Sequence, residues 1–435
     1  MKKILDPVTM EEAARRSGFL SKVGNSMDNS QVKEPLAIIY INIDLFRLAN
    51  IELGYINGNQ LISDIFRRLL SCFGIDEFIE HLYFDNFVAF IADGSRTLPL
   101  IEKIQEALSL PFTIKGKAIS VSATIGVAVS QKKELETPEE LLRNAEIAMF
   151  YARSHGRGNF EIYQHEIRTN FTQRFEMELE LRRAIFNNEF LVYYQPVVAF
   201  GSNEFMGFEA LARWKHPTRG ILTAAQFLQV AEEAKLLEVI SYTILRRACN
   251  QTREWKAKFG LYPMLSVNVN LSTGQILDPN LVMEVEKALI QTGLEAFSLH
   301  LEISEDSLMV NPELAARQLL NLRVLGVKAV LDGFGVGKSS LSWLSRFQLD
   351  EIKFDRGFLY QLLENRKTIP LAESVVNTAR NLGMKVVVKG IETEEQVKKF
   401  GNLKFDYFQG NFLSFPLSPE DANNWLESQL NAMSS

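Results

Sequence analysis

The sequence predicts two α/β domains, of which the second is a (β/α)8-type barrel, on the strength of three observations. The chain has 435 residues, which is more than one hydrophobic core usually covers. Strand-like and helix-like patterns alternate along most of its length. In the second half, polar residues recur where the strand-like runs end. Together these features favour a smaller α/β domain followed by a barrel whose functional groups gather at one end.

The first domain is predicted from the pattern between residues 36 and 160, where apolar β-rich runs alternate with segments of helical periodicity. The expected strands cover 35–43, 82–92 and 120–130, and the expected helices cover 57–73, 98–109 and 137–154. Residues 161–189 then form a charged amphipathic stretch, with Glu and Arg three and four positions apart, which suits an interdomain helix. We therefore expect domains at 1–165 and 190–435, with a linker helix at 166–189.

The barrel is predicted from a rhythm of apolar runs, most of them followed by a helical segment. The runs cover 190–198, 205–214, 264–271, 298–304, 328–334, 351–355, 385–391 and 405–412. Eight strands alternating with helices are typical of a (β/α)8-type barrel, in which the active site lies at the carboxyl ends of the strands.

Six polar residues stand at or near those strand ends: Glu209, Asn270, Glu302, Asp332, Asp355 and Gln409. One such residue alone is more often a solvated loop residue or a helix cap. Six on separate strands instead predict a single pocket. Oxygen ligands of this kind favour Mg²⁺ or Mn²⁺ over zinc, and a phosphodiester substrate is the natural expectation.

Composition excludes several classes of protein. Hydrophobic residues make up 46% of the chain and charged residues 23%, which argues against a disordered or fibrous protein. The net charge is −6 and the basic residues are scattered, so we expect no nucleic-acid partner. Cys72 and Cys249 form no disulfide framework or zinc motif, which fits a reducing compartment. Because we find neither a signal peptide nor a membrane-length apolar window, we expect a cytoplasmic protein without a membrane span.

The second half resembles the EAL domain, a family of cyclic di-GMP phosphodiesterases, over roughly residues 170–430. The matching segments follow the family's order and spacing. They are YYQPVV at 193–198, FEALARWKHPTRG at 208–220, NLSTGQI at 270–276, LEISED at 301–306, DGFGVGKSSLSWL at 332–344, IKFDRGF at 352–358, GIET at 390–393 and QGNFLSFPL at 409–417.

This resemblance implies a first metal site made of Glu209, Asn270, Glu302 and Asp332. The two carboxylates that would hold a second metal are replaced by Gly333 and Lys389. The family's catalytic positions correspond to Glu209, Lys353 and Glu392. Its ligand-contact positions correspond to Gln195, Leu211, Arg213, Asp355, Gln409 and Pro416.

The exchange of two acidic residues for Gly333 and Lys389 changes the local charge by about three units, all unfavourable to a second divalent ion. We therefore expect little or no hydrolysis. Two placements of Lys389 are open. Its ammonium group could fill part of the vacated cation volume and pair with Asp332 or Glu209, acting as a surrogate cation. Alternatively, it points outward from the strand end.

The first half resembles the GGDEF domain of diguanylate cyclases over residues 1–165. The segments that match are DPVT at 6–9, IDLFRLANIELGYINGN at 43–59, LYFDNF at 82–87, SATIGVAV at 122–129 and AEIAMFYARSHGRGN at 145–159. The resemblance implies that Asn42 and Asn86 replace the metal-binding carboxylates, and that Tyr83 and Phe84 fill the place of two signature glycines.

Three further positions complete this degenerate cyclase site. Asn59 replaces the base-reading Asp, whereas Asn50 and Asp85 match the family. Residues 74–77 lack the Arg of the family's inhibitory site, so we expect no product feedback there. We expect no cyclase activity. Either a nucleotide pocket or a plain structural role remains open for the asparagines.

Three functions follow from these observations. The first is a catalytically inactive or strongly impaired protein that serves as a cyclic di-GMP receptor or regulatory scaffold. The second is a weak single-metal phosphodiesterase that yields linear pGpG, and the third is a protein-interaction module that ignores the nucleotide. We expect that no cofactor is required, although one Mg²⁺ or Mn²⁺ could bind. The expected partners are cyclic di-GMP, a regulatory protein and a second copy that pairs through the EAL barrel.

Overall fold

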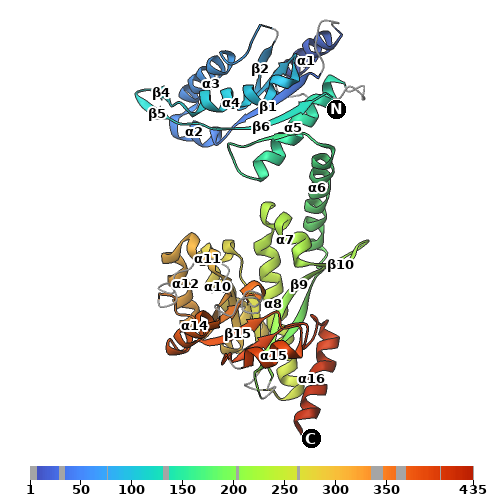
Figure 1. Cartoon of the computed structure of the whole chain (residues 1–435), viewed down its shortest axis with the longest axis vertical. Helices are drawn as coiled ribbons and strands as arrows, with labels where there is room; N and C mark the ends of the chain where they lie inside the picture. Colours follow the sequence, from blue (N-terminus) through green and yellow to red (C-terminus); the bar gives the residue numbers. More distant parts are fainter. Residues whose placement is uncertain are drawn as a thin grey trace. The chain divides into compact units, whose positions relative to one another are not determined.

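The computed structural model describes residues 7–28, 35–75, 77–130, 137–201, 205–261, 265–334, 346–358, 369–401 and 403–434. The chain divides into two compact units, residues 1–176 and 177–435. The boundary falls within the long helix α6 (His165–Phe186), drawn in Figure 1. The expected domain limits, with a linker at 166–189, stay a prediction. Parts of the matching segments at 6–9, 74–77 and 332–344 lie outside the described residues.

The first unit contains a mixed sheet in the order β2-β3-β1-β6-β7. Its strands are β1 (Ala37–Ile43), β2 (Phe78–Tyr83), β3 (Asn86–Ile91), β6 (Ala123–Val129) and β7 (Phe160–Ile162). The central β1 is buried along its whole length and pairs antiparallel with β3 and β6. Because alternate side chains of a strand point to opposite faces, Ile39 and Ile41 enter one core while Ile38 and Tyr40 enter another.

Helices cover both faces of this sheet (Figure 1). α2 (Phe46–Leu53), α3 (Tyr55–Leu70) and α4 (Thr97–Ser109) bury apolar side chains in the core of one face, and α1 (Pro7–Met27) and α5 (Pro138–Ser154) do so on the other. Gly126 allows α5 to approach β6, because a β-carbon there would lie 2.1 Å from the Met149 nitrogen. The remaining short elements are the η1 turn (Gly94–Arg96) and the hairpin β4 (Phe112–Ile114) with β5 (Lys117–Ile119).

One predicted strand is wrong. The run 82–92 is not continuous, because β2 ends at Tyr83 and β3 begins at Asn86. The turn between them holds Phe84 in a left-handed conformation, with φ +50°. Phenylalanine is rarely found in such turns, so the apolar run concealed the hairpin.

The second unit is a closed barrel, which confirms the predicted fold class. Its strands follow one another around the barrel in chain order, and β8 closes the sheet by pairing with β9. The strands are β8 (Phe190–Ala199), β9 (Phe205–His216), β11 (Ser266–Asn270), β12 (Leu299–Ser304), β13 (Lys328–Phe334), β14 (Glu351–Phe354), β15 (Lys385–Lys389) and β16 (Tyr407–Gln409). The first strand departs from a regular (β/α)8 barrel, because β8 runs antiparallel to both of its neighbours.

Helices surround the barrel, and a short strand, β10 (Gly220–Thr223), extends β9 as a hairpin. The helices are α7 (Ala224–Glu233), α8 (Leu237–Phe259), α9 (Thr273–Leu277), α10 (Leu281–Thr292), η2 (Ala296–Ser298), α11 (Glu305–Val310), α12 (Pro312–Leu325), α14 (Ile369–Asn381), α15 (Glu394–Gly401) and α16 (Pro419–Ser434). An aromatic cluster joins β8 and β9 to α8 and α16 through Tyr194, Phe208, Trp255 and Trp425. This packing holds β8 and β9, the first two strands of the barrel, against the two helices.

Among the described residues, we find no helix with the length and apolar character needed to cross a membrane.

Candidate functional site

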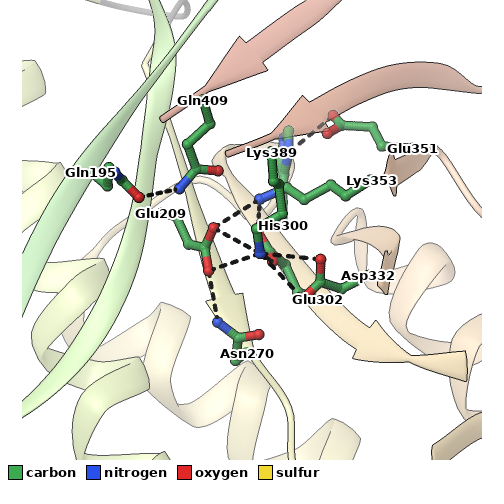
Figure 2. A network of polar contacts seen from close by, with 10 residues as sticks. All are labelled: Gln195, Glu209, Asn270, His300, Glu302, Asp332, Glu351, Lys353, Lys389 and Gln409. Carbon is green, nitrogen blue, oxygen red and sulfur yellow. Dashed lines mark hydrogen bonds and ion pairs between the residues drawn. The ribbon is translucent and has the colours of Figure 1, made fainter. Parts of the chain in front are cut away.

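The barrel brings the four predicted metal ligands to one place (Figure 2). β9, β11, β12 and β13 lie parallel, so that Asn270 is in register with Glu302, and Ser304 with Asp332. Glu209 on β9 accepts a hydrogen bond from Asn270 Nδ2 at 3.1 Å. Because parallel strands present their carboxyl ends at one edge, the strand-end residues of the sequence become neighbours here.

Lys389 occupies the centre of this group. Its Nζ lies 3.1 and 3.2 Å from the two carboxylate oxygens of Asp332 and 3.2 Å from Glu209 Oε2. A third carboxylate, that of Glu302, lies 3.7 Å away. Because its Nζ faces these three carboxylates, the ammonium group points into the barrel. The side chain is 23% exposed and so still reaches the solvent-facing end. It does not point outward from the strand.

Lys353 forms a second, deeper layer of positive charge. Its side chain is fully buried, and its Nζ donates to Glu302 and, at 3.3 Å, to Glu209. A buried ammonium group is stable only when carboxylates face it. Three carboxylates and two ammonium groups therefore form one compact, nearly balanced charge cluster.

The electrostatics of the cluster favour the charged form of both lysines. Burial opposes that form, but the Glu209 and Glu302 carboxylates outweigh it and raise the pKa of Lys353 and of Lys389. Burial also opposes ionisation of Glu209, yet Lys353 and Lys389, with hydrogen bonds from Gln409 and Asn270, lower the pKa of Glu209. Burial and the adjacent Glu209 carboxylate raise the pKa of Glu302 to about 7.

The four predicted ligands do not fit a divalent ion in this arrangement. The position between Glu209, Glu302 and Asp332 is filled by the Lys389 ammonium group. Within the described ranges, no cluster of three or more His, Cys, Asp or Glu side chains is arranged to hold a metal. A metal could enter only if Lys389 moved away from all three carboxylates.

Gly333 follows Asp332 with a backbone φ of +75°. A side chain here would meet nothing within 4 Å, but L-residues rarely adopt this conformation. The strand pairing shifts register between Leu331 and Phe334, so the glycine lies in an irregular part of β13. Space is therefore available for a longer residue at 333, and the backbone is what opposes it.

A pair of glutamines closes one side of the site. Gln409 Nε2 donates to Gln195 Oε1 at 2.9 Å, linking β16 to β8. Gln195 Nε2 donates in turn to the Ser414 carbonyl at 3.1 Å and lies 3.4 Å from Asn411 Oδ1. Sequence reasoning found the two glutamines but missed Asn411 and Ser414. Their place within the matching segment 409–417, shortly after Gln409, was the available signal.

The other predicted ligand contacts are Leu211, Arg213, Asp355 and Pro416. Arg213 is half-buried, and its guanidinium lies 5.3 Å from the centre of the Tyr193 ring. Leu211 and Pro416 are partly exposed. Asp355 accepts a hydrogen bond from the Gly357 nitrogen at 2.6 Å. None of these four residues contributes a charge to the central cluster.

Glu392 stands apart from the other two predicted catalytic residues, Glu209 and Lys353. It pairs with Arg356 at 2.8 Å, at an exposed position. Arg356 packs beside the Gly390 backbone, where a β-carbon would lie 2.8 Å from its side chain. Sequence reasoning missed Arg356, although it directly follows the predicted site residue Asp355.

Sequence reasoning also missed a buried polar pair near the cluster, His300 and Glu351 (Figure 2). His300 Nδ1 lies 3.1 Å from Glu351 Oε1. His300 lies two residues before Glu302 on β12, and Glu351 lies two residues before Lys353 on β14. Because side chains two positions apart on a strand share a face, both point into the barrel. Burial opposes ionisation of Glu351, but His300 outweighs it and lowers the pKa of Glu351.

The first unit gathers only part of the predicted cyclase-like site. Asn42 and Asn86 are directly opposite each other on β1 and β3, and Asn42 Nδ2 donates to Asn86 Oδ1 at 2.9 Å. Asn86 Nδ2 donates to Asp85 Oδ1 at 3.0 Å. Burial raises the pKa of Asp85, against opposing contributions that include the nearby Arg153. The amides thus bond to each other across the strands.

The remaining predicted residues of that site take separate places. Tyr83 lies 3.4 Å from the Tyr40 hydroxyl, and Phe84 is exposed with its ring against Phe46. Asn50 is buried against Gly58, and Asn59 is exposed on α3.

Asp44 is a buried acid that sequence reasoning missed. It accepts hydrogen bonds from Ser122 and Thr124 at 2.7 Å and from the Gly158 nitrogen at 2.9 Å. Its position two residues after Asn42, within a DxD-like pair, was the available signal. These bonds tie the end of β1 to the segment that leads to β7.

Comparison with protein families gives two matches. The model of the EAL domain matches residues 178–416, and that of the diguanylate cyclase GGDEF domain matches residues 5–159. An uncharacterized signaling protein of Caulobacter vibrioides is 35% identical over 387 residues, which cover 88% of this chain and 47% of the relative. The cyclic di-GMP phosphodiesterase NbdA of Pseudomonas aeruginosa is 31% identical over 405 residues, which cover 92% of this chain and 51% of NbdA.

Solved structures include similar barrels. The PaMucR phosphodiesterase in its c-di-GMP complex is 34% identical, with a TM-score of 0.54, and the match covers 57% of this chain and 99% of that one. This chain spans about half the length of the two curated relatives named above.

Proposed function

This chain belongs to the EAL domain family and carries a GGDEF domain before its EAL domain, and on that premise we propose that it is a cyclic di-GMP receptor with little or no hydrolytic activity. The proposal rests on one observation. The Lys389 ammonium group lies 3.1 Å from Asp332 and 3.2 Å from Glu209, in the position that a bound cation would need. Lys389 would thus act as a surrogate cation.

A covalently attached cation changes the chemistry of the site. An ammonium group balances the carboxylates but cannot polarise a bound water into hydroxide, which is what a divalent ion supplies in this kind of hydrolysis. A divalent ion placed about 4 Å from Lys389 would meet a repulsion of about 8 kcal/mol at an effective dielectric constant near 20. Hydrolysis should therefore be strongly impaired, whereas the shape of the pocket is kept.

Binding depends on other residues. Arg213 is half-buried on β9 and can donate charge-assisted hydrogen bonds to a phosphate. The Gln195–Gln409 pair holds two further amide groups in fixed positions on β8 and β16. The similar barrel of the PaMucR phosphodiesterase, solved as its c-di-GMP complex and 34% identical, supports the same nucleotide as the ligand here.

A weak single-metal phosphodiesterase is the second candidate. It is favoured by the presence of Glu209, Asn270, Glu302 and Asp332 in one cluster. It would require Lys389 to leave that cluster. The third candidate is a protein-interaction module. In that case Arg213 and the glutamine pair would not bind a nucleotide.

Calorimetry with cyclic di-GMP on the full chain separates the three functions. We expect saturable binding that is the same with EDTA as with Mg²⁺ or Mn²⁺, and no linear pGpG by chromatography of the same samples. Metal-dependent pGpG formation that Glu209→Ala abolishes would establish the phosphodiesterase. Absence of both binding and turnover would leave the interaction module.

A matched pair of variants tests the place of binding. Arg213→Gln should weaken the affinity for cyclic di-GMP by about ten-fold or more, because a charge-assisted hydrogen bond is lost. Lys215→Gln, which removes a positive charge from an exposed position two residues further along β9, should leave the affinity unchanged. Equal losses in both variants would contradict binding at Arg213.

A further inference from the structure

A second cavity, of about 500 Å³, lies on the outer side of the barrel. It is bounded by β8, α8, the end of α10 and the start of α16, all within the second unit. Leu191, Val192 and Tyr194 line it from the strand, and Arg246 and Arg247 line it from α8. We propose that this cavity binds a small organic anion with an apolar body.

The two arginines supply the positive charge. Arg246 has neither a hydrogen bond nor an ion pair among the residues that the structure describes, so its guanidinium is available. Arg247 donates one hydrogen bond, to the Asn188 carbonyl at 3.2 Å. Two arginines on the helix wall, each with several unused N–H donors, favour a ligand with carboxylate or phosphate oxygens.

The carboxylate on the lining does not cancel this charge. Glu254 accepts hydrogen bonds from Asn250 at 2.7 Å and from Gln251 at 3.2 Å. It forms no ion pair with either arginine among the described residues. The Asn250 and Gln251 amides donate to this carboxylate. Two arginines and one glutamate leave the lining with an excess of one positive charge.

Tyr194 provides an independent indication of a ligand. Its side chain is 1% exposed, with the ring centre 4.7 Å from that of Trp255 and 6.0 Å from that of Phe208. Within the described chain its hydroxyl has no hydrogen-bond partner, although buried tyrosine hydroxyls usually have one. The packed ring holds a hydrogen-bond donor in a fixed position in the cavity wall.

The rest of the wall combines apolar side chains with the polar Gln291 and Thr292. Leu191, Val192 and Pro419 offer a surface that an aliphatic or aromatic body would cover. A volume near 500 Å³ is in the range of small-molecule sites, which combine such walls with a few convergent polar groups. The positive charge and the apolar surface together define the ligand class.

This cavity is separate from the site at the barrel mouth. Tyr194 and Gln195 are consecutive on β8 and therefore face opposite sides of the sheet. Gln195 points to the glutamine pair of the first site, whereas Tyr194 lines the outer cavity. The proposed anion site thus does not depend on cyclic di-GMP.

Calorimetry on the full chain with phenyl phosphate and with benzoate tests the proposal. At least one anion should bind saturably, and the neutral analogue benzyl alcohol should not. Binding of only the phosphate would assign the ligand to organic phosphates, and binding of only benzoate would assign it to carboxylates. If neither anion binds saturably, or if benzyl alcohol binds as well as they do, the proposal fails.

Variants locate the binding. Arg246→Gln and Arg247→Gln should each lower the affinity for the anion by about ten-fold, and Tyr194→Phe should lower it by about three-fold, because each change removes a hydrogen-bond donor. Arg317→Gln, an exposed position on α12, is the matched control and should change nothing. Unchanged affinity in both α8 variants, or an equal loss in Arg317→Gln, would place the anion elsewhere and overturn the proposal. Either α8 variant suffices if the other does not fold.

Discussion

The GGDEF and EAL domains of this chain differ in what has replaced their predicted metal-binding carboxylates. In the first, two neutral amides, Asn42 and Asn86, bond to each other across neighbouring strands. In the second, the ammonium group of Lys389 enters a cluster of three carboxylates. One replacement removes charge from the site, and the other supplies the opposite charge from within the chain.

This difference accounts for the unequal state of the two sites. A neutral amide pair needs no counter-ion, so the strands can close over it and the neighbouring residues can serve other contacts. Buried carboxylates remain costly unless a cation faces them. Lys389 pairs with the EAL carboxylates and places a positive charge among them without a metal. We therefore expect charge-changing substitutions to lower the free energy of unfolding more in the EAL domain than in the GGDEF domain.

The largest effect is expected for Lys389→Glu. A fourth carboxylate would face Glu209, Glu302 and Asp332 with only Lys353 left as a cation, which should lower the free energy of unfolding of the barrel by about 3–5 kcal/mol. Urea unfolding followed by tryptophan fluorescence measures this in the EAL unit alone, because Trp214, Trp255, Trp343 and Trp425 all belong to it.

Two controls accompany the lysine variant. Lys385→Glu, at an exposed position on the same strand, should cost less than about 1 kcal/mol. Chelators should leave the unfolding of the wild-type chain unchanged, whereas added Mn²⁺ should recover part of the loss in Lys389→Glu. A Lys389→Glu variant as stable as the wild type would exclude the surrogate-cation role.

A smaller effect is expected when carboxylates are restored in the GGDEF domain. Asn42→Asp with Asn86→Glu would set two buried acids opposite each other, which should cost about 2–3 kcal/mol without metal. Hydrogen exchange of the β1 and β3 amides reports this loss. No cyclase product should form from GTP, because Tyr83 and Phe84 remain in place.

The matched control for that pair is Asn59→Asp, at an exposed position on α3, where protection should be unchanged. Cyclic di-GMP synthesis by the Asn42→Asp, Asn86→Glu variant would show that the two aromatic residues do not block the site.

Gly333→Ala and Gly333→Asp should each lower the free energy of unfolding by about 1 kcal/mol, because a residue with a side chain must then adopt a positive φ. Tryptophan fluorescence in urea again gives the value. Comparing the two separates strain from charge, since a smaller loss in Gly333→Asp than in Gly333→Ala would mean that the new carboxylate pairs with a nearby cation. No loss in either would contradict backbone strain at this position.

The smallest effect is expected for Arg356→Gln. Its ion pair with Glu392 is exposed, and such pairs contribute less than about 1 kcal/mol. The stability of the barrel should hardly change in the urea experiment. A loss as large as that of Lys389→Glu would mean that the charge cluster extends to Glu392.

Much of the barrel site could be predicted because its residues obey a repeating rule. Asn270, Glu302 and Asp332 stand at or near the ends of parallel strands, and Glu209 stands near the end of the parallel pairing of β9 with β11, so all four reach one edge. The direction in which Lys389 points could not be predicted, because it depends on which charges the folded barrel places around the strand end.

Other features had no local signal. The run at 190–198 has the same apolar pattern in either direction, so nothing in it indicated that β8 is antiparallel. The turn at Phe84 lacks the glycine or asparagine that normally marks a hairpin. Contacts such as those of Gln195 with Asn411 and Ser414 join residues more than two hundred positions apart. They follow from closure of the barrel.

The conformation of Gly333 bears on how this site could change over evolutionary time. Two of the four glycine codons differ from an aspartate codon by a single base, so an acid at position 333 is within easy mutational reach. That step alone meets an unfavourable backbone angle, and a change of Lys389 to an acid alone leaves four carboxylates facing a single cation, Lys353. We expect both single-step intermediates to be less stable than the present chain. The lysine and the glycine together should therefore oppose the stepwise gain of a second metal site.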